Sequence, residues 1–374
     1  MNAVKFNIPG GQTRVLVAPL DWGLGHATRC IPVISELIKQ NCMVFVAAET
    51  HVKTLLQKEF PQLQFIELKG YRVRYSHNKF WMPVKLLLQL PNIMFRVYAE
   101  NRWLKKAVKD HKIDAVISDN RMGLHHKQIP TIYITHQLTI KTGNLLTESI
   151  AQKIHYHYIN KFSACWVPDV EEAVNLAGAL SHPATRPKVP VTYLGFLSRF
   201  EKTTFQNKYA LCIILSGPEP QRTVLEKIVL ADLEKMSGKI FLIRGLLQEI
   251  EIPVVNNASI EIKNHLPAYK LSEIIQQSEI VISRCGYSTV MDLVKLQKTS
   301  ILVPTPGQTE QEYLAGYLQA QKIFFTADQE SFSLPVAIKN ATAFENNEWP
   351  VGFNEYKTVI ENFIGALSPD NAGI

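Results

Sequence analysis

Short runs of continuous apolar residues recur along this chain, and most are followed by a turn and then by a stretch with helical spacing. Strands that alternate with helices in this way favour parallel sheets covered on both faces, because such strands are apolar throughout. The runs lie at 14–19, 42–49, 63–68, 114–119, 131–135 and 164–169, and again at 210–217, 239–245, 278–286 and 299–307. The pattern predicts an α/β fold that is built twice.

Residues 178–209 interrupt the alternation with dense proline and mixed charge, which indicates a connection between domains. A chain of 374 residues is long enough for two domains of about 150 residues each. We therefore expect one Rossmann-like domain at 1–200 and a second at 201–350. A helical region at 80–110, interrupted by two prolines, and a last helix at 354–367 complete the pattern.

The five cysteines stand apart without a CxxC pair, which favours buried free thiols over disulfides or a zinc site. The N-terminus lacks the apolar core of a signal peptide. No apolar run reaches the ~20 residues that span a bilayer. We expect a cytoplasmic protein, with peripheral association with the inner face of the cytoplasmic membrane left open.

Positive charge is concentrated in residues 69–112. This segment holds eleven Lys or Arg residues against Glu100 and Asp110, a local excess of +9, whereas the whole chain has a net charge of +7. Aromatic and leucine side chains are interleaved with the cations. The mixture predicts an interfacial patch that meets anionic lipids, and the alternative is a pair of core helices with solvated basic faces. Nucleic acid is not expected as a partner, because no nucleic-acid-binding motif accompanies the charge.

The stretch PLDWGLGHATRC, residues 19–30, follows the first apolar run. Gly23 and Gly25 indicate a close backbone turn at the start of a helix. A dinucleotide loop would need a third glycine where Thr28 stands, although Glu49 resembles the ribose ligand of such sites. A dehydrogenase and a purely structural cap therefore remain alternatives.

His26 favours a catalytic loop instead. In the first turn of a helix the dipole disfavours the protonated imidazole, which keeps the ring available as a base for an acceptor hydroxyl. Asp119 ends another expected strand. It is a candidate to orient His26, and the alternative is that it caps the next loop.

The second half carries a group of polar residues after successive strands. Gly286, Ser288 and Thr289 open a helix after 278–286, so that hydroxyls and free N–H groups form an anion site, and Arg284 adds charge for a phosphate. Asp292, one turn further, is expected to accept ribose hydroxyls, or else to complement the helix dipole.

Two further loops extend this group. Gln308, Glu310, Gln311 and Glu312 cluster at the start of a helix, and such amides and carboxylates suit the hydroxyls of a sugar better than a metal. Ser216 and Gly217 precede another helix and offer a second phosphate contact. Each piece alone would be an ordinary cap or turn.

These residues resemble the GT-B glycosyltransferases of the family 28 kind, whose best-known member is MurG. GLGHATR looks like the family's N-terminal glycine–histidine loop, and SRCGYSTVMDL with VPTPGQTEQEYLAG looks like its donor-site signature. The resemblance implies two Rossmann-like domains that face each other across a cleft, with the acceptor on the N-terminal domain and a UDP-sugar on the C-terminal one. It also implies that segment 351–374 packs back on the N-terminal domain.

By motif position, the resemblance assigns the ribose to Asp292, the sugar to Gln311 and Glu312, and the acceptor side to Gly23, Gly25 and His136. Asp292 and Glu312 replace the usual glutamate and glutamine, and His136 replaces a glutamate. Such enzymes generally use no metal or other cofactor.

The sequence therefore predicts inverting, metal-independent transfer of a hexose or N-acetylhexosamine from a UDP-sugar to a lipid-linked or glycan acceptor, as in cell-envelope synthesis. A UDP-sugar 2-epimerase and a non-catalytic nucleotide-sugar sensor are the alternatives. The sugar, the acceptor and the oligomeric state stay open.

Overall fold

The structure of the protein is a computed structural model that describes residues 11–71, 82–142, 144–246, 248, 250–347 and 349–367. Of residues 82–91, 145 and 146 it describes the backbone only. The described residues divide into two compact units. The first extends to Leu197 and resumes at Val351, and the second runs from Ser198 to Pro350. Residues 178–197, expected in a connection, thus belong to the first unit.

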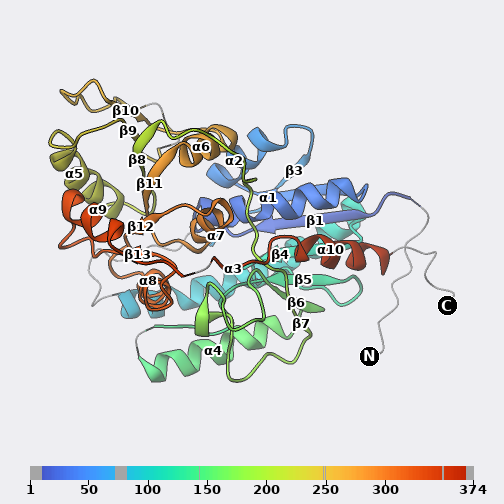
Figure 1. Ribbon diagram of the computed structural model, residues 1–374. Coiled ribbons are helices and arrows are strands. Elements are labelled where there is room, and N and C mark those ends of the chain that lie inside the picture. The colour runs from blue at the N-terminus through green and yellow to red at the C-terminus, as the bar shows by residue number, and fades with distance from the viewer. Residues whose placement is uncertain are drawn as a thin grey trace. The chain divides into compact units, whose positions relative to one another are not determined.

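The described strands of the first unit form one parallel sheet in the order β3-β2-β1-β4-β5-β6-β7 (Figure 1). They are β1 (Arg14–Pro19), β2 (Met43–Ala48), β3 (Gln64–Glu67), β4 (Ala115–Asp119), β5 (Thr131–Ile134), β6 (Ala164–Val167) and β7 (Val191–Tyr193). The helices of this unit are α1 (Leu24–Lys39), α2 (Thr50–Glu59), α3 (Met82–His111), α4 (Leu145–Ile159) and α10 (Glu355–Gly365), with a short 3-10 helix η2 (Gly178–Leu180).

The central strands of this sheet are buried on both faces, as continuous apolar runs predict. Residues Val15–Ala18 of β1 have no exposed surface. Helix α1 buries Val33, Ile34 and Leu37, which share one side at helical spacing. Burial of each such aliphatic side chain contributes about 1.5–3 kcal/mol to the free energy of unfolding. The core therefore holds β1 and α1 in place, and with them the turn between them.

The sequence predicted that Pro83 and Pro91 interrupt the helical region at 80–110. This prediction was wrong, because α3 is continuous through both prolines. Pro83 is its second residue, a position where the missing N–H has no helical partner in any case. Pro91 removes a single hydrogen bond from a helix of 30 residues.

The second unit repeats the architecture. Its described strands form a parallel sheet in the order β10-β9-β8-β11-β12-β13. They are β8 (Tyr209–Ile214), β9 (Ile240–Ile243), β10 (Ile260–Lys263), β11 (Ser278–Ser283), β12 (Ser300–Leu302) and β13 (Phe325–Thr326). The helices are α5 (Gln221–Leu233), α6 (Ala268–Gln276), α7 (Tyr287–Leu296), α8 (Thr309–Ala320) and α9 (Leu334–Thr342).

Both sheets have one point where the strand order reverses, between β1 and β4 and between β8 and β11. In open α/β sheets, ligands bind outside the carboxyl ends of the strands at such a point. The GT-B expectation of two parallel α/β units is confirmed in this respect.

The end of the described chain returns to the first unit. Helix α10, red in Figure 1, lies beside α1, in blue. Phe363 packs edge-on against Trp166 with ring centroids 5.3 Å apart, and Phe196 N–H donates to the Gly352 carbonyl at 2.5 Å.

Candidate active site

The reversal point of the first sheet brings together residues that are far apart in the sequence. Asp119, the last residue of β4, pairs in register with Pro19 of β1 on one side and with Ile134 of β5 on the other. His26 lies in the first turn of α1, which follows β1, and His136 comes two residues after β5. Parallel strands end at the same edge, so these side chains meet there.

His26 and Asp119 are in contact. Nδ1 of His26 lies 3.3 Å from each carboxylate oxygen of Asp119. The His26 side chain is 18% exposed, whereas Asp119 is fully buried. One face of the imidazole therefore reaches the surface while Nδ1 is turned toward the interior.

Arg29, three residues after His26 on α1, occupies the centre of the cluster. Its Nε donates to Asp119 Oδ2 at 2.7 Å, and its Nη2 pairs with the other carboxylate oxygen. Nη2 also lies 2.7 Å from His26 Nδ1, and Nη1 lies 3.1 Å from His136 Nδ1. A planar guanidinium suits this arrangement because its donors form a fixed fork.

The charge of Asp119 is strongly stabilised. Burial alone would raise the pKa of this carboxyl, but the guanidinium of Arg29, the largest opposing influence, holds the pKa well below its usual range. Cys30 Sγ contacts the same carboxylate at 3.7 Å. The environment of Asp119 therefore favours its ionised form.

The glycine loop before this cluster does not have the features of a dinucleotide site. Gly23 adopts a φ of +144°, which favours glycine, and α1 begins directly after it, so Gly25 lies within the helix. Glu49, the ribose ligand of the alternative interpretation, is buried and accepts a 2.6 Å hydrogen bond from Gly70 N–H. That carboxylate holds the first unit's own backbone.

In the second unit, the loops after β8, β11 and β12 meet at the reversal point of the other sheet. Ser216 is half-buried, and Gly217 is exposed with a φ of +99°. A Cβ on Gly217 would lie 3.5 Å from Thr305 Oγ1, so the first and third loops approach closely. The structure thus brings together loops that are about ninety residues apart in the chain.

The loop after β11 leads into α7. Gly286 is the residue before the helix, and Ser288 and Thr289 lie half-buried in its first turn. The first N–H groups of a helix have no acceptor within the helix, and for this reason the helix start stays a candidate anion site.

Arg284 is a correction. Its guanidinium is buried and donates to the carbonyls of Val303, Pro304 and Gln221 and to Gln329 Oε1, the last at 2.6 Å. Burial lowers its pKa to about 10. Arg284 therefore ties the loops after β11 and β12 to α5 and is not positioned to offer its charge to a phosphate.

Asp292 lies on α7 but has a different partner from the one expected. Its Oδ1 accepts a 2.7 Å hydrogen bond from Ser198 Oγ and a 3.3 Å bond from Arg199 N–H. The Arg199 guanidinium lies 3.5 Å from Oδ2. Burial raises the pKa of Asp292, while Arg199 and Ser198 act to lower it. The carboxylate of Asp292 thus binds the segment at which the second unit begins. A ribose hydroxyl would have to bind the same carboxylate beside Ser198 and Arg199.

The residues predicted to bind sugar form a self-braced loop. Gln311 accepts from Thr305 N–H at 2.9 Å and donates to Gln308 Oε1 at 2.5 Å. Glu312 accepts from Gly307 N–H at 2.8 Å. Glu310 is half-buried in the first turn of α8. The side chains of Gln308, Gln311 and Glu312 thus brace the loop after β12.

The second unit is similar to a known sequence family. Residues 219–348 match the sequence model of the family described as "Glycosyltransferase family 28 C-terminal domain". The chain carries a glycosyltransferase family 28 C-terminal domain. The match includes α5, the loops after β11 and β12, and α8. No curated protein matches the chain.

Solved structures extend the likeness to the whole fold. Acinetobacter baumannii MurG is 14% identical with a TM-score of 0.54, over 95% of this chain and 100% of that one. The spinosyn rhamnosyltransferase SpnG, complexed with thymidine diphosphate, is 14% identical with a TM-score of 0.57, over 95% and 96%. CalG4, the calicheamicin glycosyltransferase, is 11% identical with a TM-score of 0.61, over 96% of both chains. The GT-B fold is confirmed, and with the family 28 domain it indicates a glycosyltransferase.

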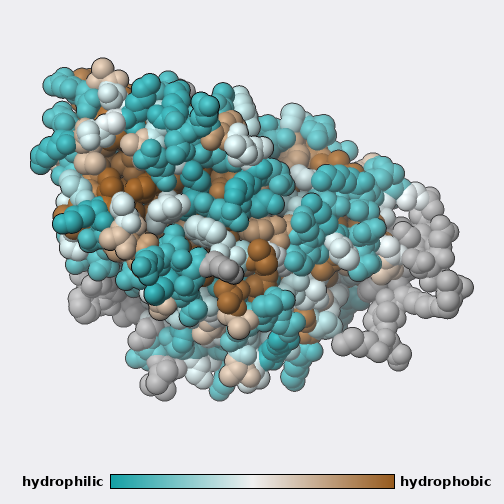
Figure 2. Space-filling view, in the orientation of Figure 1, coloured by the Kyte–Doolittle hydropathy of each residue, from teal (hydrophilic) through white to brown (hydrophobic). Residues whose placement is uncertain are grey.

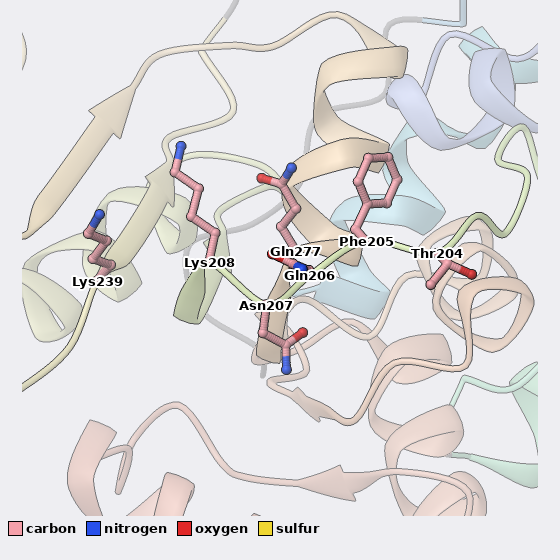
Figure 3. A pocket seen from close by; sticks show the side chains of 7 residues that line it. All are labelled: Thr204, Phe205, Gln206, Asn207, Lys208, Lys239 and Gln277. Atoms are coloured by element: carbon pink, nitrogen blue, oxygen red, sulfur yellow. The ribbon is translucent and has the colours of Figure 1, made fainter.

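The family 28 domain also has a polar surface pocket, shown in Figure 3, at the opposite edge of its sheet. It lies where β8 and β9 begin, and its lining residues are Thr204, Phe205, Gln206, Asn207, Lys208, Lys239 and Gln277. The carboxyl-end loops predicted to bind the donor do not line it.

The described residues contain no cluster of three or more His, Cys, Asp or Glu side chains placed to hold a metal. All five cysteines are free and buried. Within the described part of the chain no helix is long and apolar enough to cross a membrane. Figure 2 shows one face, on which hydrophilic residues predominate and hydrophobic ones gather in smaller areas.

Sequence reasoning missed Arg29 and the partners of Asp292. Arg29 stands within GLGHATRC, three residues from His26, so helical spacing already put both on one side of α1. Ser198 and Arg199 gave no such signal, because their contact with Asp292 joins residues more than ninety positions apart.

Proposed function

We propose that this chain transfers a hexose or an N-acetylhexosamine from a UDP-sugar to an acceptor hydroxyl, with inversion and without a metal ion. The family 28 match carries the proposal, since it includes two of the three loops at the reversal point of the second sheet. SpnG, which shares the fold, is a complex with thymidine diphosphate. That complex supports a nucleoside diphosphate as the ligand of this unit.

In the proposed donor site, the starts of α5 and α7 bind the diphosphate. Backbone N–H groups there, with the hydroxyls of Ser216, Ser288 and Thr289, would accept the negative charge that develops as the nucleotide leaves. The side chains that we assign to sugar hydroxyls lie at the start of α8 and are Gln308, Glu310, Gln311 and Glu312. Three of them, Gln308, Gln311 and Glu312, also brace the loop, so sugar binding would have to share these bonds.

In the proposed reaction, His26 takes the proton of the acceptor hydroxyl, and that oxygen bonds to the anomeric carbon as the bond to the diphosphate breaks. UDP leaves with the electron pair of the broken bond. The His26–Asp119 contact supports this role, because a buried carboxylate orients the imidazole and stabilises its charged form.

We also propose that the acceptor is lipid-linked and that α3 meets the membrane surface. Described side chains along one side of α3 are exposed at helical spacing, with Phe95 and Tyr98 at 68% and 63%. The exposed cations Arg102, Lys105, Lys106 and Lys109 continue that side. Aromatics beside cations suit the interface of an anionic bilayer. Arg72, Arg74 and Lys79 of the expected patch lie outside the described residues.

The proposal is tested first by thermal unfolding with UDP, dTDP, GDP, ADP and NAD at equal concentrations. A ligand that binds only the folded protein raises the unfolding temperature. A shift with UDP is expected. A shift with dTDP alone would indicate a dTDP-sugar as the donor in place of a UDP-sugar. A shift with NAD alone would contradict the proposed donor site.

Activity then separates the alternatives. A UDP-sugar 2-epimerase would turn over UDP-N-acetylglucosamine without an acceptor. A sensor would bind UDP and show neither transfer nor hydrolysis. Transfer that depends on an added polyprenyl-linked acceptor would support the proposed function.

A further inference from the structure

The contacts of Arg29 determine where the protons of two histidines lie. Its Nη2 is 2.7 Å from His26 Nδ1, and its Nη1 is 3.1 Å from His136 Nδ1. A nitrogen–nitrogen distance of this size accommodates one hydrogen between the two atoms. A guanidinium in a protein keeps all its protons, so the hydrogen belongs to Arg29 and each Nδ1 accepts it. A neutral imidazole with a bare Nδ1 carries its proton on Nε2.

The guanidinium cannot easily turn away from this arrangement. It is 3% exposed, and Nε and Nη2 both bind the carboxylate of the fully buried Asp119. Rotation would leave a buried negative charge without its partner, which is strongly destabilising. Asp119 therefore fixes Arg29, and Arg29 fixes the two rings.

We propose that Arg29 is a positioning residue that locks His26 and His136 in the tautomer protonated on Nε2. The inference rests on the proposed function and deepens it. In the locked tautomer His26 Nε2 is a hydrogen-bond donor and has no lone pair for the acceptor proton. His26 becomes a base only when its Nδ1 passes from Arg29 to Asp119, whose oxygens already lie 3.3 Å away.

The transfer balances without any added reactant. Nδ1 takes a proton from solvent and then donates a hydrogen bond to the Asp119 carboxylate, Nε2 releases its proton to solvent, and the net charge of the ring is unchanged. Arg29 keeps its bidentate pairing with Asp119 and gives up only the bond from Nη2 to the ring. The locked state is thus a resting state in which the imidazole binds ligand oxygens and does not deprotonate them.

The test reads the tautomers of the wild-type protein directly. The chain is labelled with ¹⁵N-histidine, and the two-bond proton–nitrogen NMR correlations distinguish Nδ1–H from Nε2–H rings. His26→Gln and His136→Gln assign the two rings among the 11 histidines. Both rings are expected to show a bare Nδ1 at neutral pH. A protonated Nδ1 on His26 would overturn the inference.

Arg29→Lys supplies the second arm. A lysine ammonium is a point donor on a flexible stem and does not span Asp119 and both rings as the guanidinium does. In this variant His26 is expected to change to the Nδ1–H tautomer. Arg186→Lys is the matched control, because Arg186 is an exposed arginine of the same unit that pairs with Glu171 at 2.7 Å. An unchanged His26 tautomer in folded Arg29→Lys would contradict the lock.

The tautomers are independent of activity, so the two proposals fail separately. Locked rings in a protein without transferase activity would remove the proposed function only. Transferase activity in a protein whose His26 carries its proton on Nδ1 would remove the lock only. If Arg29→Lys does not fold, the NMR spectrum of the wild-type protein by itself decides whether His26 and His136 carry their protons on Nε2.

Discussion

At the scale of single residues, the cluster around Asp119 is a buried charge arrangement with an exposed edge. Asp119 and Arg29 are both almost inaccessible, whereas the side chain of His26 is 18% exposed. Burying a pair of ions is favourable only with good geometry and satisfied donors. The two parallel contacts from Arg29 to Asp119 meet that condition.

Removing the carboxylate charge should therefore destabilise the first unit. In Asp119→Asn the Arg29 guanidinium stays buried without its anion, and we expect the free energy of unfolding to fall by about 3–5 kcal/mol. Urea unfolding measures it. Glu171→Gln, which removes the acid of an exposed ion pair, should change stability by less than about 1 kcal/mol. Equal losses in the two variants would contradict the account.

His155 gives a prediction for pH. It is buried, its Nε2 lies 3.0 Å from the Gln137 carbonyl, and burial lowers its pKa from 6.5 to about 4. A histidine with a lowered folded pKa stabilises the protein above pH 6.5, and this contribution is lost as the pH falls toward 4. The loss is roughly 3 kcal/mol.

The measurement is the free energy of unfolding between pH 7 and about 4, the lowered pKa of His155. His155→Gln keeps a donor for the Gln137 carbonyl but does not titrate. Its stability should depend less on pH than that of the wild type. His125, whose pKa burial also lowers to about 4, is present in both proteins and cancels in the comparison. Parallel curves would show that His155 does not contribute.

At the scale of elements, the return of α10 depends on one close backbone approach. Gly352 has a φ of +138°, and a Cβ there would lie 2.3 Å from Val170 Cγ1. The segment around it brings Tyr356, Ile360 and Ile364 into the core of the first unit.

Gly352→Ala should therefore weaken the docking of α10. We expect a loss of about 1–3 kcal/mol for the strained backbone, with a similar term for the overlap with Val170. Thermal unfolding measures it. Gly365→Ala, at the end of the same helix, meets nothing within 4 Å and should leave stability nearly unchanged. A tolerated Gly352→Ala would contradict the close approach.

Helix α3 gives the second prediction at this scale. Phe95→Ser with Tyr98→Ser should reduce association with vesicles of anionic lipid, because the aromatic side chains provide the buried apolar area. Binding should also weaken as salt rises, because the cations act through screened charge. Sedimentation with vesicles measures both. Tyr269→Ser, which removes another highly exposed aromatic, is the control. Unchanged sedimentation of the double variant would contradict the membrane proposal.

At the scale of the whole molecule, binding and chemistry are assigned to different units. His26→Ala should retain stabilisation by UDP, which at a concentration of 100 Kd amounts to about 2.7 kcal/mol. Its transfer rate should fall by about 10²–10⁴-fold, the usual contribution of a positioned acid or base. Thermal shift and product formation are measured on one preparation. Full transfer activity in His26→Ala would remove the base assignment.

The sequence alone determined the features that depend on neighbours along the chain. Continuous apolar runs predicted buried parallel strands, and the glycine before α1 predicted a tight turn. The family resemblance rested on the same local signals and is supported by the match of residues 219–348. The position of His26 in a first helical turn followed from spacing in the same way.

Only the tertiary structure decided which partners the buried charges have. Asp119 meets Arg29 because β4 lies beside β1, although ninety residues separate them. Arg284 and Asp292 look alike as ligand candidates in the sequence. In the structure, Arg284 ties the loops after β11 and β12 to α5, and Asp292 accepts a hydrogen bond from Ser198. A buried charge must be paired with whatever the strand order brings near it, and strand order is not encoded in any local pattern.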